Sequence, residues 1–248
     1  MNYQEEQLNN GNREYKSDVF SMLMQDKEYA LDVFNCLNGT EYTDAEQLEI
    51  VTLEHGISLS IRNDASFIID NQINFYEHQS TYNPNMPLRS LIYYAVEMGR
   101  ELKKSGVDIF RRKLIELPTP HFVIFYNGEE KRPEFELMRL SNAFIHKMDK
   151  PELELICKVI NINFQNNQEL LKRSKVLQGY SFFVEQVRVN RRADMPLEKA
   201  LDAAIDECIR SHVLEDFFRD KKEEVKRVMQ LDYTWEVRED LIRKEERA

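Results

Sequence analysis

The sequence has little glycine and proline and no long apolar run. Glycine and proline number 7 each among 248 residues, below their average shares of about 7% and 5%. This scarcity excludes collagen-like and linker-rich chains, so we expect helix to dominate. No apolar run approaches the ~18–20 residues of a membrane span, which predicts a soluble protein without membrane partners. Residues 1–10 carry neither the basic nor the apolar region of a secretory signal, so we expect a cytoplasmic location.

Metal-binding and nucleotide-binding motifs of the common kinds are also absent. The three cysteines, Cys36, Cys157 and Cys208, form no CxxC pair, which is typical of a reducing compartment and opposes a cysteine-built zinc site. We expect them to be core or helix-face thiols. The chain has no HExxH, GxGxxG or GxxxxGK[ST] motif, which opposes a zinc hydrolase and a nucleotide cofactor. The net charge of -10 opposes a non-specific basic surface for DNA, but it allows a local basic groove.

Helical periodicity marks three parts of the chain. Apolar residues recur at helical spacing from Glu14 to Leu37, and Asn38-Gly39 follows as a stop signal. A second long helix is predicted over 88–104. From about Asn167 to the end the pattern is again helical, with a break at Met195-Pro196.

Short apolar runs predict strands between these helices. They cover 48–53, 57–69, 73–79, 121–126, 136–140 and 153–162. The second and third runs are joined by Asp70-Asn71-Gln72 and predict a hairpin. This order predicts an α/β (α+β) domain over 13–165 and an all-helical C-terminal region over 166–248.

The predicted hairpin brings two carboxylates together. If Asp70-Asn71 is a two-residue loop, Asp64 lies directly opposite Glu77 and Arg62 faces Gln79. Directly opposed side chains share a face, with β-carbons ~4.5–5.5 Å apart. A three-residue loop would instead place the two acids on opposite faces.

Two opposed carboxylates repel unless a proton or a cation lies between them. A hard divalent ion suits the pair, since Mg²⁺ takes one or two protein carboxylates and bridges to phosphate oxygens. We therefore expect Mg²⁺, with Mn²⁺ as the alternative ion, and metal-assisted phosphodiester hydrolysis. The plainer alternative is that Asp64 caps a strand end and Glu77 is a solvated strand residue.

These residues also carry a family resemblance. An Asp followed thirteen residues later by Glu-x-Gln, on consecutive strands behind a helix and a strand, resembles the PD-(D/E)XK nuclease superfamily. More specifically it resembles the Rpn-like branch of recombination-promoting nucleases and putative transposases, in which Gln often replaces the superfamily lysine. The phrases that carry the resemblance are YKSDVFSMLM, LNGTEYTDAEQLEIVTLE, NDASFIIDNQINFYEHQSTYNPNMPLR and PTPHFVIFYNG. It spans roughly 15–165, and the tail segment MPLEKALDAAIDECIR is similar as well.

The resemblance implies a fold and a set of site residues. The fold is a restriction-endonuclease-like core, of order αβββαβ, with a mixed sheet flanked by helices. Asp64 and Glu77 would be the catalytic metal ligands, and Gln79 would stand at the position of the lysine. Gln offers only neutral hydrogen-bonding groups, so Arg62, across the hairpin, is a candidate for the missing charge.

Basic residues on the second predicted helix are candidates for nucleic-acid binding. They are Arg89, Arg100 and Lys104, with Tyr93 beside them for stacking. Arg111, Arg112 and Lys113 follow in the next loop. The alternative is an ordinary solvated helix face.

Together, the residues and the resemblance predict a metal-dependent DNA endonuclease associated with transposition or recombination, or with phage defence. A homodimer is also expected, since two cuts need two sites. The alternative is a catalytically weak or inactive protein of the nuclease fold that binds nucleic acid or a protein partner. The acidic net charge and the absent lysine favour this alternative.

Overall fold

The computed structural model describes residues 15–51 and 63–225. By their contacts the described residues form two compact units. One contains the sheet and comprises residues 24–51 and 63–167, and the other is helical and comprises residues 15–23 and 168–225. The candidate site lies within the sheet unit.

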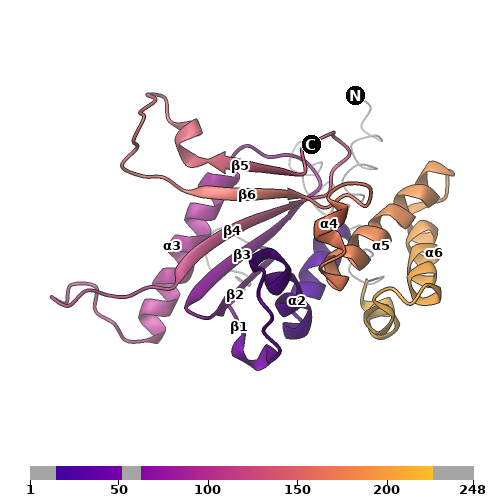
Figure 1. The fold of residues 1–248 in the computed structure, drawn as a ribbon, viewed down its shortest axis with the longest axis horizontal. Coiled ribbons are helices and arrows are strands. Elements are labelled where there is room, and N and C mark those ends of the chain that lie inside the picture. Colours follow the sequence, from indigo (N-terminus) through magenta and orange to yellow (C-terminus); the bar gives the residue numbers. More distant parts are fainter. Residues whose placement is uncertain (1–14, 52–62, 226–248) are drawn as a thin grey trace, which may run out of the picture. The chain divides into compact units, whose positions relative to one another are not determined.

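The sheet unit is built on six strands in the order β1-β2-β3-β4-β6-β5 (Figure 1). Antiparallel pairing joins β1 to β2, β2 to β3, and β5 to β6, whereas β3, β4 and β6 run parallel. The sheet is therefore mixed, and the predicted α/β class of the fold is confirmed. The strands are β1 (Glu49–Ile50), β2 (Ala65–Ile69), β3 (Gln72–Gln79), β4 (Thr119–Tyr126), β5 (Phe135–Arg139) and β6 (Ile156–Asn161).

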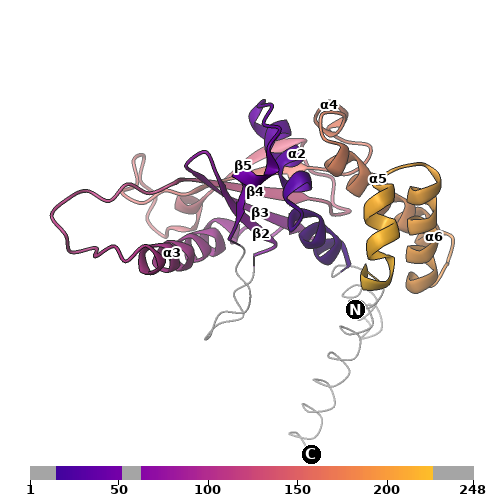
Figure 2. The ribbon, with the colours of Figure 1, turned by 90° about the horizontal axis from the view of Figure 1, so that it is seen from below.

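Helices cover both faces of the central strands. Helix α3 (Met86–Lys104) connects β3 to the parallel strand β4, as a crossover must, and Figure 2 shows it along one face. Its buried side chains, including Tyr93 and Met98, join a core with Phe75 and Phe122. Strand β3 is buried almost throughout, which is typical of a strand covered on both faces.

The opposite face packs against helix α2 (Lys27–Asn38). A chain of aromatic contacts runs from α2 across the sheet. The ring of Phe34 lies 6.2 Å from that of Phe67, Phe67 lies 5.0 Å from Tyr76, and Tyr76 lies 5.2 Å from Phe125. Edge-to-face aromatic pairs of this kind add to the stabilisation that comes from burial.

The single helix predicted from Glu14 to Leu37 is wrong. The structure has two helices, one over residues 15–24 and then α2, separated by Gln25 and Asp26. The carboxylate of Asp26 accepts hydrogen bonds from the backbone N–H groups of Glu28 and Tyr29. This N-cap starts a new helix. The break was not predicted, because the helical spacing of the apolar residues continues through it. Gly39 ends α2 with φ 66°, as the stop signal predicted.

Each of the six predicted runs contains a strand of the sheet, but the bounds differ. Strands β3 and β4 begin before the predicted runs 73–79 and 121–126, and β5 is shifted by one residue from the run 136–140. In the described part of the run 48–53, Glu49–Ile50 forms β1, behind the short 3₁₀ helix η1 (Ala45–Gln47), and residues 52–53 lie outside the described residues. The run 153–162 is a strand only over Ile156–Asn161. A second 3₁₀ helix, η2 (Leu140–Ala143), follows β5. Residues 57–62 of the predicted first hairpin strand lie outside the described residues.

The helical unit contains α4 (Gln168–Leu171), α5 (Lys175–Arg192), α6 (Leu197–Arg210) and a helix over 215–225. The predicted break at Met195-Pro196 is confirmed, since it separates α5 from α6. Residues 15–23 belong to this unit. There the Tyr180 hydroxyl donates to the backbone oxygen of Lys16 at 2.9 Å, and the rings of Tyr180 and Phe20 are 5.6 Å apart.

None of the helices within residues 15–51 and 63–225 is both long enough and apolar enough to cross a membrane.

The β2–β3 turn sets the register on which the site depends. Asp70 and Asn71 have φ values of 49° and 56°, and the flanking Ile69 and Gln72 are paired. Two consecutive positive φ values in a two-residue loop define a type I′ turn. Asn and Asp tolerate this conformation, whereas β-branched residues do not.

We expect Asn71→Val to lower the free energy of unfolding by about 1–2 kcal/mol, because a β-branched residue is strained at positive φ. Asn71→Gly is the matched control and should be at least as stable as the wild type. Urea unfolding followed by circular dichroism measures both. A valine variant as stable as the glycine variant would contradict the assigned turn.

Candidate functional site

Asp64 and Glu77 lie opposite each other at the open end of the β2–β3 hairpin. The ladder pairs Ile69 with Gln72 and continues to Ala65 with Tyr76, so the next position places Asp64 against Glu77. The two-residue loop is confirmed, and the three-residue alternative is wrong. The two carboxylates therefore belong to the face of the sheet that α3 covers.

Backbone amides hold both carboxylates in place. The N–H of His78 donates to Asp64 Oδ2 at 2.6 Å, and the N–H of Asp64 points to the Glu77 carboxylate and favours its charged form. One oxygen of Asp64 therefore caps the strand end, as expected if Asp64 has only a structural role. The plainer alternative fails for Glu77, which is only 8% exposed and is not a solvated strand residue.

Glu77 is a buried carboxylate that is only partly compensated. Its Oε1 accepts a hydrogen bond from Arg89 Nη2 at 2.6 Å. Its Oε2 is buried and has no hydrogen-bond partner among the described residues. Burial, and then the charge of Asp64, hold the pKa of Glu77 well above its ordinary range, against the opposing effect of Arg89. An unpaired buried carboxylate oxygen is costly, so the site favours a further cation or a proton.

Arg89 reaches the site from the first turns of α3. Its Nε and Nη2 donate to the hydroxyl oxygen of Tyr93 at 3.1 and 2.6 Å. Its side chain is 40% exposed, whereas Tyr93 is 5% exposed. Burial raises the pKa of Tyr93 to about 12, so this hydroxyl stays protonated at neutral pH. Arg89 therefore bridges a buried carboxylate and the surface.

Gln79 lies two residues beyond Glu77 on the same face of β3 and is buried. Its side-chain oxygen accepts from the N–H of Asn83 at 3.4 Å, and its backbone oxygen accepts from the N–H of Asn127 at 2.8 Å. Gln79 thus ties the loop before α3 to the end of β4. This is a positioning contact, and the role implied for Gln79 at the lysine position stays a prediction.

The structure does not gather all the residues expected to bind nucleic acid. Tyr93 is in the core, so its expected stacking role is wrong, because α3 turns this ring toward the sheet. Arg100 is 3.7 Å from Glu97 and Lys104 is 2.7 Å from Glu49. Fifteen residues of helix place Lys104 about 22 Å from Arg89 along the axis. Arg62 lies outside the described residues.

The basic loop after α3 is also distant from the carboxylates. Arg111, Arg112 and Lys113 are exposed, and Figure 1 shows the loop reaching away from the sheet. The loop enters β4 at Thr119, whose N–H donates to Asn71 in the hairpin turn at 2.9 Å. That is the opposite end of β3 from Gln79.

Sequence reasoning missed the partner of Glu77. It treated Arg89 as a surface residue on the second helix. The sequence could have indicated this contact. The helix of a βαβ crossover starts next to the end of the preceding strand, and Arg89 follows Glu77 by only twelve residues.

A nucleophilic cysteine is not part of the site. Cys157 on β6 donates a hydrogen bond to Ser90 Oγ on α3 at 3.4 Å. Burial raises its pKa to about 11, so it is a neutral thiol at physiological pH. All three cysteines are buried and none is in a disulfide, as expected for core or helix-face thiols.

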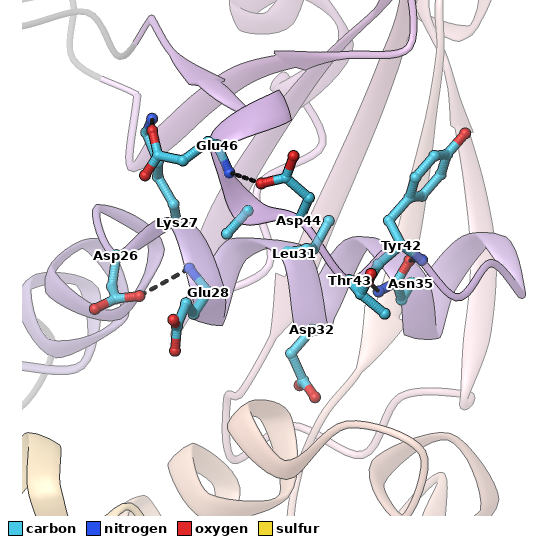
Figure 3. A pocket seen from close by; sticks show the side chains of 11 residues that line it. Asp26, Lys27, Glu28, Leu31, Asp32, Asn35, Tyr42, Thr43, Asp44 and Glu46 are labelled. Carbon is cyan, nitrogen blue, oxygen red and sulfur yellow. Dashed lines mark hydrogen bonds and ion pairs between the residues drawn. The ribbon is translucent and has the colours of Figure 1, made fainter.

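A separate pocket lies between α2 and η1, lined by acidic side chains (Figure 3). Several of these side chains make internal contacts. Asp26 accepts from the N–H of Glu28, Asp44 accepts from the N–H of Glu46, and Lys27 pairs with Glu46 at 2.7 Å. These are helix caps and a surface ion pair, and they do not converge on the pocket.

The residues of the hairpin fit a hard divalent cation. Within 15–51 and 63–225, no cluster of three or more His, Cys, Asp or Glu side chains forms a ready-made metal cage. Mg²⁺ needs only one or two carboxylates, since waters and substrate oxygens complete its coordination. The buried, unpartnered Oε2 of Glu77 opposite Asp64 supplies such a pair.

Comparison with known proteins adds no homologue. The chain matches no family model, no curated protein and no solved structure. The resemblance to the Rpn-like nucleases therefore stays a prediction that rests on the quoted residues.

We expect Glu77→Gln to make stability less sensitive to pH. The folded protein holds the Glu77 proton more tightly than the unfolded chain does, so the wild type loses stability as pH rises from about 4.3, the ordinary glutamate pKa, through the raised value. The amide keeps the shape and an acceptor for Arg89 but cannot ionise.

The measurement is urea unfolding of both proteins between pH 4 and 9. The difference in free energy of unfolding should grow in favour of Glu77→Gln as pH rises. Glu116→Gln, at an exposed position, is the control and should follow the wild type. Parallel curves for wild type and Glu77→Gln would contradict a raised pKa at Glu77.

Proposed function

We propose that this protein is a metal-dependent endonuclease that hydrolyses phosphodiester bonds in DNA, in association with transposition or recombination. The observation that carries the proposal is the buried carboxylate of Glu77, with one unpartnered oxygen, directly opposite Asp64. Arg89 compensates only one oxygen of Glu77, so a further cation at the other oxygen would remove part of the cost of burying the pair.

The fold of the sheet unit supports a restriction-endonuclease-like core. From α2 to β4 its helices and strands follow the order α2-β1-β2-β3-α3-β4, with η1 between α2 and β1 and with β5 and β6 after β4. The part from α2 to β4 has the αβββαβ order that the resemblance implies. Glu77 lies on the third strand of this order and Asp64 directly precedes the second, on the face covered by α3.

In this proposal Asp64 and Glu77 hold Mg²⁺, or Mn²⁺ in its place. When bound, such an ion supplies charge stabilisation at the phosphate and acidifies an attacking water. The N–H of His78 orients one oxygen of Asp64, and Arg89 binds one oxygen of Glu77. Gln79 fixes the adjoining loop.

A second candidate is a nuclease-fold protein that binds nucleic acid or a protein partner without cutting. The Arg89–Glu77 ion pair of 2.6 Å favours it, because a cation of the protein already neutralises one oxygen of the site. The absence of the superfamily lysine at Gln79 favours it too.

Cleavage of supercoiled plasmid tests the proposal. The purified protein should nick or linearise the plasmid with Mg²⁺ or Mn²⁺ and not with chelator. Asp64→Asn and Glu77→Gln keep the hydrogen-bond acceptors and should lower the rate roughly a hundredfold or more. Glu97→Gln, which removes another buried carboxylate of the same unit, is the matched control and should cut normally.

Wild-type protein that leaves the plasmid intact under all these conditions would contradict the endonuclease proposal for DNA. Cleavage that persists in folded Asp64→Asn and Glu77→Gln would contradict the assigned site. Circular dichroism of each variant checks that the fold is retained.

A further inference from the structure

The guanidinium of Arg89 contacts the carboxylate pair from a partly exposed position on α3. It contacts the buried Glu77 at 2.6 Å while 40% of its side chain remains exposed. The charges of both Glu77 and Asp64 raise the pKa of Arg89, which places its positive charge in the field of the two acids. Arg89 is thus the counter-ion of the site in the protein alone.

A divalent cation bound by the same acids would meet this positive charge at close range. Like charges a few ångströms apart repel more strongly in a partly buried site than in water. The repulsion is relieved if the guanidinium moves away from Glu77. The exposure of Arg89 leaves room on the solvent side for that movement.

Tyr93 limits how far the guanidinium can travel. Its buried hydroxyl accepts from both Nε and Nη2 of Arg89, and Tyr93 lies one turn further along α3. A guanidinium released from Glu77 therefore stays at the site. Arginine has the planar donor array that binds phosphate oxygens in pairs.

We propose that Arg89 exchanges partners during binding: it pairs with Glu77 when no metal is present, and it binds a phosphate of the nucleic-acid strand once a divalent cation is held by Asp64 and Glu77. The inference rests on the proposed function and deepens it. It supplies, from α3, the positive charge that Gln79 lacks on the strand.

The exchange makes metal and nucleic acid bind cooperatively. The metal releases Arg89 for the phosphate, and the phosphate removes Arg89 from competition with the metal. Linkage requires that each ligand raise the affinity for the other by the same factor. Two affinities measured with and without the other ligand therefore test the inference.

The first measurement is Mn²⁺ binding to the full chain without nucleic acid, followed by electron paramagnetic resonance. Arg89→Met removes the competing charge and should bind Mn²⁺ about tenfold more tightly than the wild type. Asp64→Asn should lose the site. Arg100→Met, on the same helix and paired with Glu97, is the matched control and should bind like the wild type.

The second measurement is fluorescence anisotropy of a short labelled DNA duplex, in chelator and in Ca²⁺ as a hard cation with oxygen ligands. In Ca²⁺, Arg89→Met should bind the duplex about tenfold more weakly than the wild type. In chelator the two should bind alike, because Arg89 is then paired with Glu77. Any effect of Arg100→Met should be the same in both conditions.

The outcomes separate this inference from the proposed function. Equal Mn²⁺ affinity of wild type and Arg89→Met, with the site lost in Asp64→Asn, would overturn the exchange and leave the metal site standing. An equal loss of duplex affinity in Ca²⁺ and in chelator would also overturn it. No Mn²⁺ binding by any variant would overturn both the exchange and the metal site.

Discussion

The burial of one glutamate opposite an aspartate is the constraint on which the site depends. Glu77 lies on a strand that helices cover on both sides, and the hairpin register places Asp64 against it. Two acids in that position oppose folding by desolvation and by repulsion. Backbone amides and one arginine compensate part of this cost. One oxygen of Glu77 has no hydrogen-bond partner among the described residues. Costs of this kind are typical of functional sites.

The crossover helix α3 supplies the arginine that compensates Glu77. Because α3 joins parallel strands β3 and β4, its first turns lie beside the end of β3. Arg89 reaches Glu77 from there, and Tyr93 holds it from the core side. In the proposed exchange, Arg89 compensates the carboxylate pair in the protein alone and yields to a divalent ion. This explains how the carboxylate pair persists without metal.

The sequence predicted what local chemistry determines. The two-residue turn at Asp70-Asn71 and the alternation of side chains along each strand were sufficient to predict the hairpin register. That register places Asp64 opposite Glu77. Tertiary contacts determine the rest. The apolar spacing of the first helix continues through the cap at Asp26, so periodicity alone joined two helices. The burial of Tyr93 depends on how α3 rotates against the sheet, and no linear pattern specifies that rotation.

The central claim is that Asp64 and Glu77 hold a divalent cation. The most direct test is a crystal of the full chain soaked in Mn²⁺, with diffraction data collected at the manganese absorption edge. The account predicts an anomalous peak within coordination distance of Glu77 Oε2 and the Asp64 carboxylate, with Arg89 turned away from Glu77. No peak at that position, with the Arg89–Glu77 ion pair intact at saturating Mn²⁺, would contradict it.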